Sequence, residues 1–68
     1  MSTELTDRER QVVLLIASGL SNREIGHRLD VSESTVKVHL RHIFVKLGIH
    51  NRTALAALAA RSLDRDKE

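Results

Sequence analysis

Residues 21–40 contain two helix-start signals separated by a short turn, and this pattern constrains the fold more than any other in the chain. Ser21 is followed three residues later by Glu24, which is the capping-box pattern that starts a helix. After the turn, Ser32 is suited to cap a second helix, with Glu33 at the positive end of that helix. Two short helices joined by a tight turn predict a helix-turn-helix unit, whose second helix is free to enter the major groove of DNA.

The apolar residues predict which side of these two helices is buried. The first helix of the helix-turn-helix unit is expected to end near Leu29, and the second helix of the unit to run over about 33–47. Gly26 costs the first helix about 1 kcal/mol against alanine, and its missing side chain is expected to let the second helix approach closely. In the second helix, four apolar residues recur at helical spacing and form one stripe, namely Val36, Leu40, Ile43 and Leu47.

Two further helices are predicted on either side of this unit. Thr6 and Glu9 form another capping box, which starts a helix over about 7–18 that ends at a glycine. Asn51 is expected to cap a last helix over roughly 52–63. The helix-turn-helix unit therefore supplies the second and third of four predicted helices.

Composition limits the chain to a small domain built from helices. With 68 residues it can hold one domain, expected to span 1–68 with a core from about 5 to 63. The absence of proline and the single aromatic residue, Phe44, favour short aliphatic helices, so the predicted fold class is all-α. No apolar run approaches the about 20 residues that a membrane-spanning helix needs, and the first residues lack a signal-peptide pattern. These features predict a cytoplasmic protein with no membrane partner.

Basic residues are concentrated in the predicted helix-turn-helix, although the whole chain carries a net charge of only +2. Residues 21–52 hold an excess of three positive charges, because Arg23, Arg28, Lys37, Arg41, Lys46 and Arg52 stand against Glu24, Asp30 and Glu33. A local positive surface on this motif favours double-stranded DNA as the partner.

The outer face of the predicted third helix carries the candidates for reading bases. Lys37, Val38 and Arg41 lie opposite the apolar stripe. Arg41 is suited to a bidentate contact with guanine, and Val38 to a contact with a thymine methyl group. Phosphate contacts, which position a protein without reading sequence, are expected from five further residues, namely Asn22, Arg23, Ser34, Thr35 and Lys46.

The predicted fourth helix is apolar nearly all round between Ala54 and Ala60. Its core residues are expected to be Leu55, Leu58 and Ala59, which leaves an outward face of Ala56, Ala57 and Ala60. Small residues let two helix backbones come close, so this face predicts a homodimer. The same face also supports an alternative function, a protein-interaction module that docks on a partner through the fourth helix.

No pattern indicates catalysis, a metal ion or a cofactor. Serine and histidine are both present, but nothing places a nucleophile, a base and an orienting acid together. His39 and His42 are three residues apart and could touch one ion, but no third ligand is evident, and the chain has no cysteine. The sequence therefore predicts a binding protein and not an enzyme.

These motifs resemble those of the LuxR/FixJ-type DNA-binding domain over about residues 5–60. The matching segments include Leu5-Thr6-x-Arg8-Glu9, Ser34-Thr35-Val36-Lys37 and Lys46-Leu47-Gly48. The resemblance implies a four-helix domain whose third helix reads DNA and whose fourth helix forms a two-fold dimer. A two-fold dimer is expected to bind an inverted repeat, and a tandem arrangement is the alternative. Carried over residue by residue, the resemblance assigns base contacts to Lys37, Val38 and Arg41.

Domains of this family are commonly the output part of a response regulator in a two-component system, or of a small-molecule-sensing activator. The resemblance therefore implies a receiver or ligand-sensing domain N-terminal to this one as a further partner, although a few members of the family stand alone without a sensor. Leu14 and Val45 are apolar where the family usually has polar residues. Each is either tolerated singly as exposed apolar surface or marks a contact with such a domain or with RNA polymerase. Gly26 stands where alanine is typical of the family.

Overall fold

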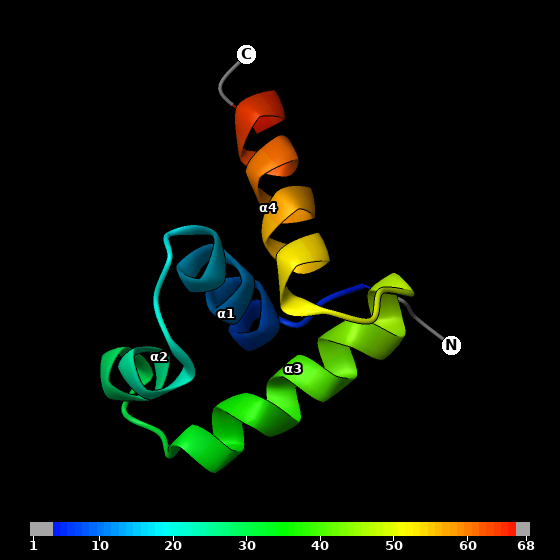
Figure 1. Cartoon of the computed structure of the whole chain (residues 1–68). Coiled ribbons are helices and arrows are strands. Elements are labelled where there is room, and N and C mark those ends of the chain that lie inside the picture. Colours follow the sequence, from blue (N-terminus) through cyan, green and yellow to red (C-terminus); the bar gives the residue numbers. More distant parts are fainter. Residues whose placement is uncertain (1–3, 67–68) are drawn as a thin grey trace.

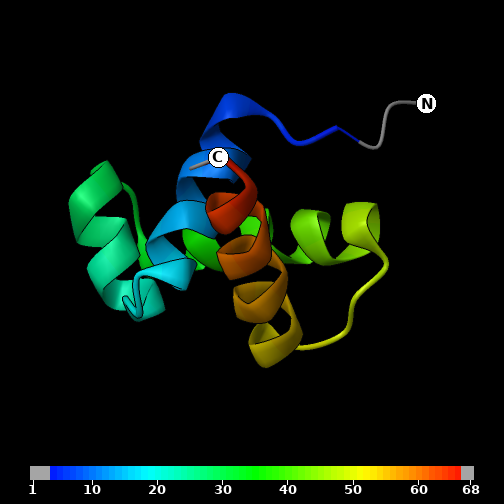
Figure 2. The same cartoon turned by 90° about the horizontal axis from the view of Figure 1, so that it is seen from above.

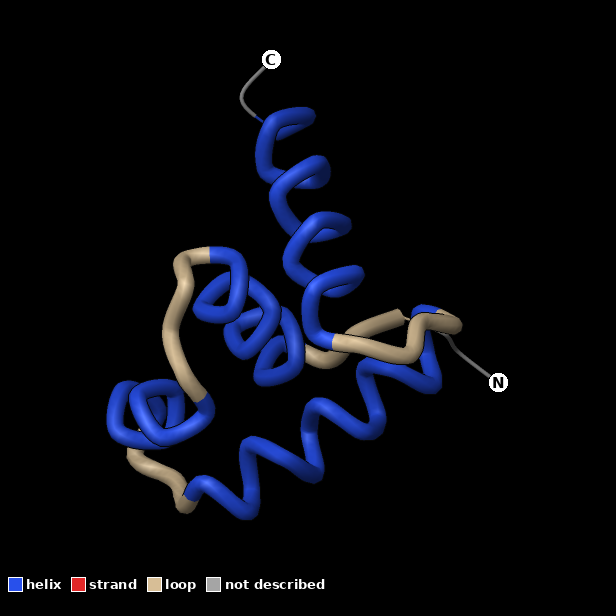
Figure 3. The backbone as a smooth tube through the Cα atoms, viewed as in Figure 1, coloured by secondary structure: helices blue, strands red, loops and turns tan. Residues whose placement is uncertain are grey.

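The computed structural model describes residues 4–66, and side chains over residues 4–61. It contains α1 (Asp7–Ala17), α2 (Asn22–Leu29), α3 (Glu33–Leu47) and α4 (Arg52–Asp66), joined by short loops (Figures 1 and 3). The described part of the chain has no strand, which confirms the all-α prediction. Three helices end within one residue of their predicted limits, whereas α4 continues three residues beyond the predicted end.

α1 lies at the centre of the fold. It packs against each of the other three helices, and α2 packs in addition against α3. Seen from above, α1 and α4 lie side by side, with α2 on the far side of α1 (Figure 2). Each helix contributes to one core of buried side chains, which consists of Val12, Ile16, Ile25, Val36, Leu40, Ile43 and Leu55.

Each predicted cap forms. The Oγ1 of Thr6 accepts from the Glu9 amide at 3.1 Å, and the Thr6 amide donates to the Glu9 carboxylate at 2.8 Å. Ser21 forms the same reciprocal pair with the residue three positions later, at 3.2 and 2.8 Å. Ser32 accepts from the third amide of α3, and Asn51 from the third amide of α4. Each helix start is therefore determined by residues within three positions of one another in the sequence.

The turn between α2 and α3 explains why residue 26 is glycine. A Cβ at Gly26 would lie 2.7 Å from the carbonyl oxygen of Val31, which is backbone and cannot move aside easily. The Val31 amide donates to the carbonyl of Gly26 at 2.9 Å, and Asp30 takes a left-handed conformation with φ of 59°. The close approach to Gly26 that was expected from the sequence is thus present. The segment that approaches Gly26 is the backbone of the turn at Val31 rather than the body of α3.

The orientation of α4 differs from the prediction. Leu55 and Ala59 are buried as expected, but Leu58 is 39% exposed and Ala56 packs against the core. On a helical wheel, Ala56 and Leu58 both lie about 80° from the middle of the buried stripe. The wheel therefore could not decide between them, and the core lies on the side of Ala56. The outward side of α4 includes Ala57, Leu58 and Ala60.

Candidate nucleic-acid interface

α3 has one face in the core and one face in solvent. Val36 and Ile43 are fully buried and hold the helix against α1 and α2. On the opposite side, Lys37, Val38 and Arg41 are exposed, with Val38 at 45%. The structure therefore brings the three residues expected to read bases onto one accessible surface, supported from behind by rigid packing.

Lys37 has one weak partner within its own helix. Its Nζ lies 3.9 Å from the carboxylate of Glu33, one turn earlier, and both side chains are at least half exposed. Exposed pairs of this kind contribute only about 0.3–0.5 kcal/mol. The ammonium of Lys37 is therefore free to exchange Glu33 for an acceptor on DNA.

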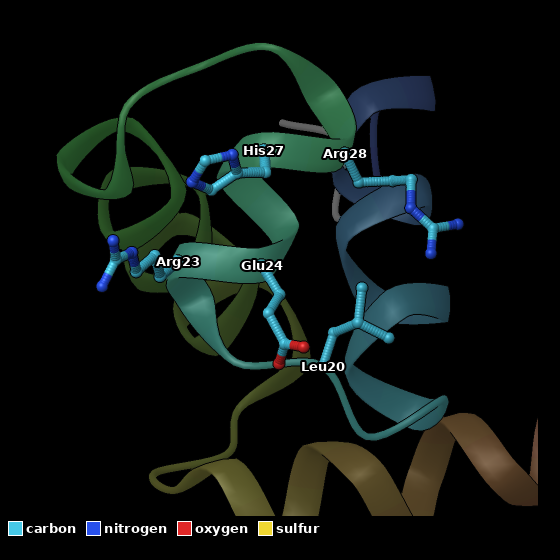
Figure 4. Close-up of a pocket in the computed structure, with 5 residues that line it drawn as sticks. All are labelled: Leu20, Arg23, Glu24, His27 and Arg28. Carbon is cyan, nitrogen blue, oxygen red and sulfur yellow. The ribbon is translucent and has the colours of Figure 1, made fainter.

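Two of the expected phosphate contacts lie in the first turn of α2. Arg23 is exposed and lines an open hollow together with Leu20, Glu24, His27 and Arg28 (Figure 4). In this view Arg23 and Arg28 extend to opposite sides of α2. Asn22 is half-buried, and its Oδ1 accepts a hydrogen bond from Arg52 at 2.6 Å.

The carboxylate of Glu24 in the same hollow is part of the fold. It accepts from the Ser21 amide at 2.8 Å, and this hydrogen bond is the main reason why the pKa of Glu24 is lowered. Its negative charge also lies at the positive end of α2. Glu24 is thus a helix cap, as the sequence predicted, and stays ionised near neutral pH.

Two hydroxyl groups that were expected to bind phosphate stand at the start of α3. Ser34 is exposed, whereas Thr35 is half-buried. The Oγ1 of Thr35 lies 2.9 Å from the Oγ of the cap residue Ser32, and either can donate. When Ser32 donates, the hydroxyl hydrogen of Thr35 is left for another acceptor.

Lys46, the fifth expected phosphate contact, is half-buried and forms an ion pair with Glu9. Its Nζ donates to Oε1 of Glu9 at 2.7 Å and to the carbonyl of Glu4 at 3.4 Å. Glu9 is only 3% exposed, and the hydrogen bond from Lys46 is the first cause of its lowered pKa. The ammonium therefore neutralises a buried carboxylate, and we leave Lys46 out of the proposed DNA contacts.

The sequence carries a second signal at Glu9, which indicates that its carboxylate is buried as well as part of a helix cap. Glu9 stands at helical spacing with Val12 and Ile16, so the cap residue also lies on the buried face of α1. A buried carboxylate requires a cation or several hydrogen bonds. No local pattern could have identified its partner, because Lys46 lies 37 positions later in the chain.

Arg52 is a second residue whose role the sequence did not predict. It is the first residue of α4, and its guanidinium donates to Oδ1 of Asn22 and to the carbonyl oxygen of Leu20. These bonds join the start of α4 to the junction between α1 and α2.

Neither a metal centre nor a membrane-spanning helix is found within residues 4–66. No three histidine, aspartate or glutamate side chains described within residues 4–61 come together in a way that could hold an ion. None of its helices combines the length and the apolar character needed to cross a membrane.

The fold and the accessible face of α3 define a helix-turn-helix DNA-binding domain. The sequence pattern described as "Bacterial regulatory proteins, luxR family" matches residues 3–59. The chain belongs to this family. It is therefore a LuxR-type DNA-binding domain of a transcriptional regulator.

Relatives of the chain are regulators of greater length. It is 52% identical over 54 residues to the nitrate/nitrite response regulator protein homolog of Haemophilus influenzae, covering 79% of this chain and 26% of that protein. It is 49% identical over 53 residues to the nitrate/nitrite response regulator protein NarL of Escherichia coli, covering 78% and 24%. With the HTH-type transcriptional regulator MalT of Vibrio cholerae it shares 51% identity over 51 residues, covering 75% and 6%. The chain thus spans between 6% and 26% of the length of these relatives.

Proposed function

We propose that this domain reads a specific duplex sequence by placing α3 in the major groove of DNA. The observation that carries the proposal is the exposed cluster of Lys37, Val38 and Arg41 on a helix whose other face is buried. The guanidinium of Arg41 can donate two hydrogen bonds to guanine, and Val38 can contact a thymine methyl group. Each good pair discriminates against a wrong base by about 1–3 kcal/mol.

Contacts with the DNA backbone would position this helix. We assign them to Asn22 and Arg23 at the start of α2, and to Ser34 and Thr35 at the start of α3. The first helix of a helix-turn-helix crosses the backbone while the second enters the groove, so both helix starts approach phosphates. Such contacts raise affinity for any sequence and make it sensitive to salt.

The domain is proposed to bind as a symmetric dimer through α4. Ala57, Leu58 and Ala60 leave an apolar surface on the outward side of this helix. Ala56, which the sequence also assigned to the interface, packs against its own core and is not included. Two domains related by a two-fold axis would place their α3 helices in successive major grooves, about 10 bp apart. The expected operator is an inverted repeat.

The names and lengths of the relatives support a larger regulator as the working protein. Two of them are response regulators by name, and the chain covers only about a quarter of each. We propose by analogy that this domain acts as the output part of a regulator with a receiver or ligand-sensing domain. Contacts with that domain or with RNA polymerase are assigned to Leu14 and Val45, which are 45% and 78% exposed. A cytoplasmic location is part of the same proposal.

Selection from a pool of random DNA duplexes at two salt concentrations tests the proposal. We expect an enriched inverted repeat, with affinity that falls steeply as salt rises. Salt-sensitive binding without any enriched sequence would contradict base reading by α3. No binding at either salt would favour the alternative in which α4 docks on a partner protein.

A further inference from the structure

Arg52 uses both terminal nitrogens of its guanidinium at the junction of α1 and α2. Nη1 donates to Oδ1 of Asn22 at 2.6 Å, and Nη2 donates to the carbonyl oxygen of Leu20. The side chains of Arg52 and Asn22 are half-buried, which reduces the competition from water. The planar guanidinium group of arginine can donate to two acceptors at once in a fixed geometry. The single ammonium group of lysine cannot reproduce this arrangement.

This contact fixes which way the amide of Asn22 points. Arginine carries only donors, so the end of the amide that faces it must be the carbonyl oxygen. The amide nitrogen is then at the other end, and within residues 4–61 it has no hydrogen-bond partner. No buried side-chain nitrogen or oxygen of the described residues lacks a partner, so this nitrogen reaches solvent. Asn22 therefore presents two N–H donors to the outside.

These donors stand where a phosphate is expected. Asn22 is the first residue of α2, at the positive end of that helix, and Arg23 beside it is exposed. In a helix-turn-helix complex this end of the first helix lies over the DNA backbone, whose phosphate oxygens only accept hydrogen bonds.

We propose that Arg52 is a positioning residue for DNA binding, which holds the amide nitrogen of Asn22 toward the DNA backbone. The proposal rests on the proposed function of the domain. It also gives α4 a second role. α4 does not pack substantially against α2, so the hydrogen bond from Arg52 is what ties the proposed dimer helix to a DNA contact.

Three substitutions separate this role from a merely structural one. Asn22→Asp keeps an oxygen for Arg52 but removes the N–H donors, so the domain should melt as the wild type does and bind its operator about tenfold or more weakly. Asn22→Ala removes both contacts. Arg52→Lys keeps the positive charge but cannot donate to both acceptors in the same geometry, and we expect a loss of about fivefold in affinity for the operator. Arg61→Lys is the matched control, because Arg61 is an exposed arginine of the same helix.

A double-mutant cycle gives the decisive comparison. Measured on folded protein below the melting transition, Arg52→Lys should weaken DNA binding when Asn22 is present and have little further effect in the Asn22→Ala background. If the fold-losses in affinity of Arg52→Lys and Asn22→Ala instead multiply in the double variant, Arg52 acts through the fold alone and the proposal is overturned.

The side-chain amide signals of Asn22 in the NMR spectrum supply a measurement without DNA. Arg52→Lys should shift both of these signals in the free domain, whereas Arg61→Lys should not. Unchanged signals would overturn the positioning role. A wild-type domain that binds no DNA, with the shift present, would instead refute the proposed function and the DNA-contact role of both residues with it.

Discussion

The ammonium of Lys46 lies 2.7 Å from the carboxylate of Glu9, and this ion pair joins the last turn of α3 to the first turn of α1. Glu9 serves two purposes there, because the same Oε1 accepts from the Thr6 amide as part of the helix cap. The pair thus fixes the end of α3 to the central helix of the fold.

Replacing Lys46 by methionine should destabilise the domain. The change leaves the buried carboxylate of Glu9 without its cation, and we expect a loss of about 2 kcal/mol, below the roughly 3–5 kcal/mol of a fully buried pair, because Lys46 is partly exposed. Urea unfolding measures this loss. Lys37→Met removes a lysine from an exposed pair and should change stability by less than about 0.5 kcal/mol. Equal losses in the two variants would show that burial of Glu9 is unimportant.

The penalty of Lys46→Met should depend on pH. The pKa of Glu9 is lowered from its ordinary value of 4.5, chiefly by the hydrogen bond from Lys46. A carboxyl group whose pKa is lower in the folded than in the unfolded protein stabilises the fold at pH values above its unfolded pKa. This stabilisation is lost as the pH falls through the folded pKa. The difference in unfolding free energy between wild type and variant should therefore be largest near neutral pH and shrink in acid. The pKa of Glu24 is also lowered, but its helix cap is the same in both proteins, so its pH-dependent contribution cancels in the difference in unfolding free energy. A penalty that does not vary with pH would argue against ionised Glu9.

Gly26→Ala should destabilise the domain although alanine is the better helix former. The new Cβ would lie 2.7 Å from the backbone oxygen of Val31, so the turn must shift. We expect a net loss of about 1–2 kcal/mol after the helix propensity is counted. Thermal melting followed by circular dichroism measures it, and Gly26→Ser should lose at least as much. A higher melting temperature for the alanine variant would show that the turn relaxes at little cost.

Arg41→Ala should reduce discrimination rather than general affinity. Loss of a bidentate guanine contact should cost about 1–3 kcal/mol on the selected operator and relax the preference at one base pair of each half-site. Competition binding with operator and unrelated duplexes measures both effects. Arg61→Ala removes another exposed arginine, on α4, and should leave the preference unchanged. Equal weakening on all sequences would make Arg41 a phosphate contact.

Ala57→Glu should weaken the dimer and, through it, binding to an inverted repeat. Ala57 is exposed on α4, so a charge there should leave the monomer folded but disfavour an apolar interface. Sedimentation and operator affinity are the measurements. Gln11→Glu adds the same charge to an exposed position of α1 and should leave sedimentation unchanged. If Ala57→Glu changes neither quantity, α4 is not the interface.

The features that the sequence predicted well are those that act over three or four residues. Ser21 with Glu24 and Thr6 with Glu9 mark helix starts, and both pairs form the expected hydrogen bonds. The side of α4 that packs on the core was predicted only in part, because Ala56 and Leu58 are equivalent on a helical wheel and tertiary packing decides between them. The ion pair of Lys46 with Glu9 was missed because the two residues lie 37 positions apart, so no local pattern connects them. The contacts of the expected site residues with DNA stay predictions.

The central position of α1 also determines how the domain loses its structure. α1 packs against every other helix, and the buried apolar side chains described within residues 4–61 form one core to which all four helices contribute. The helix-turn-helix segment is therefore not expected to persist once α1 detaches, and unfolding should be a single cooperative transition. Destabilising substitutions in α1 would then act on gene regulation by lowering the concentration of active protein. They would raise the total protein concentration needed for half-occupancy of strong and weak operators by the same factor, and the ratio of the affinities for these operators would stay intact.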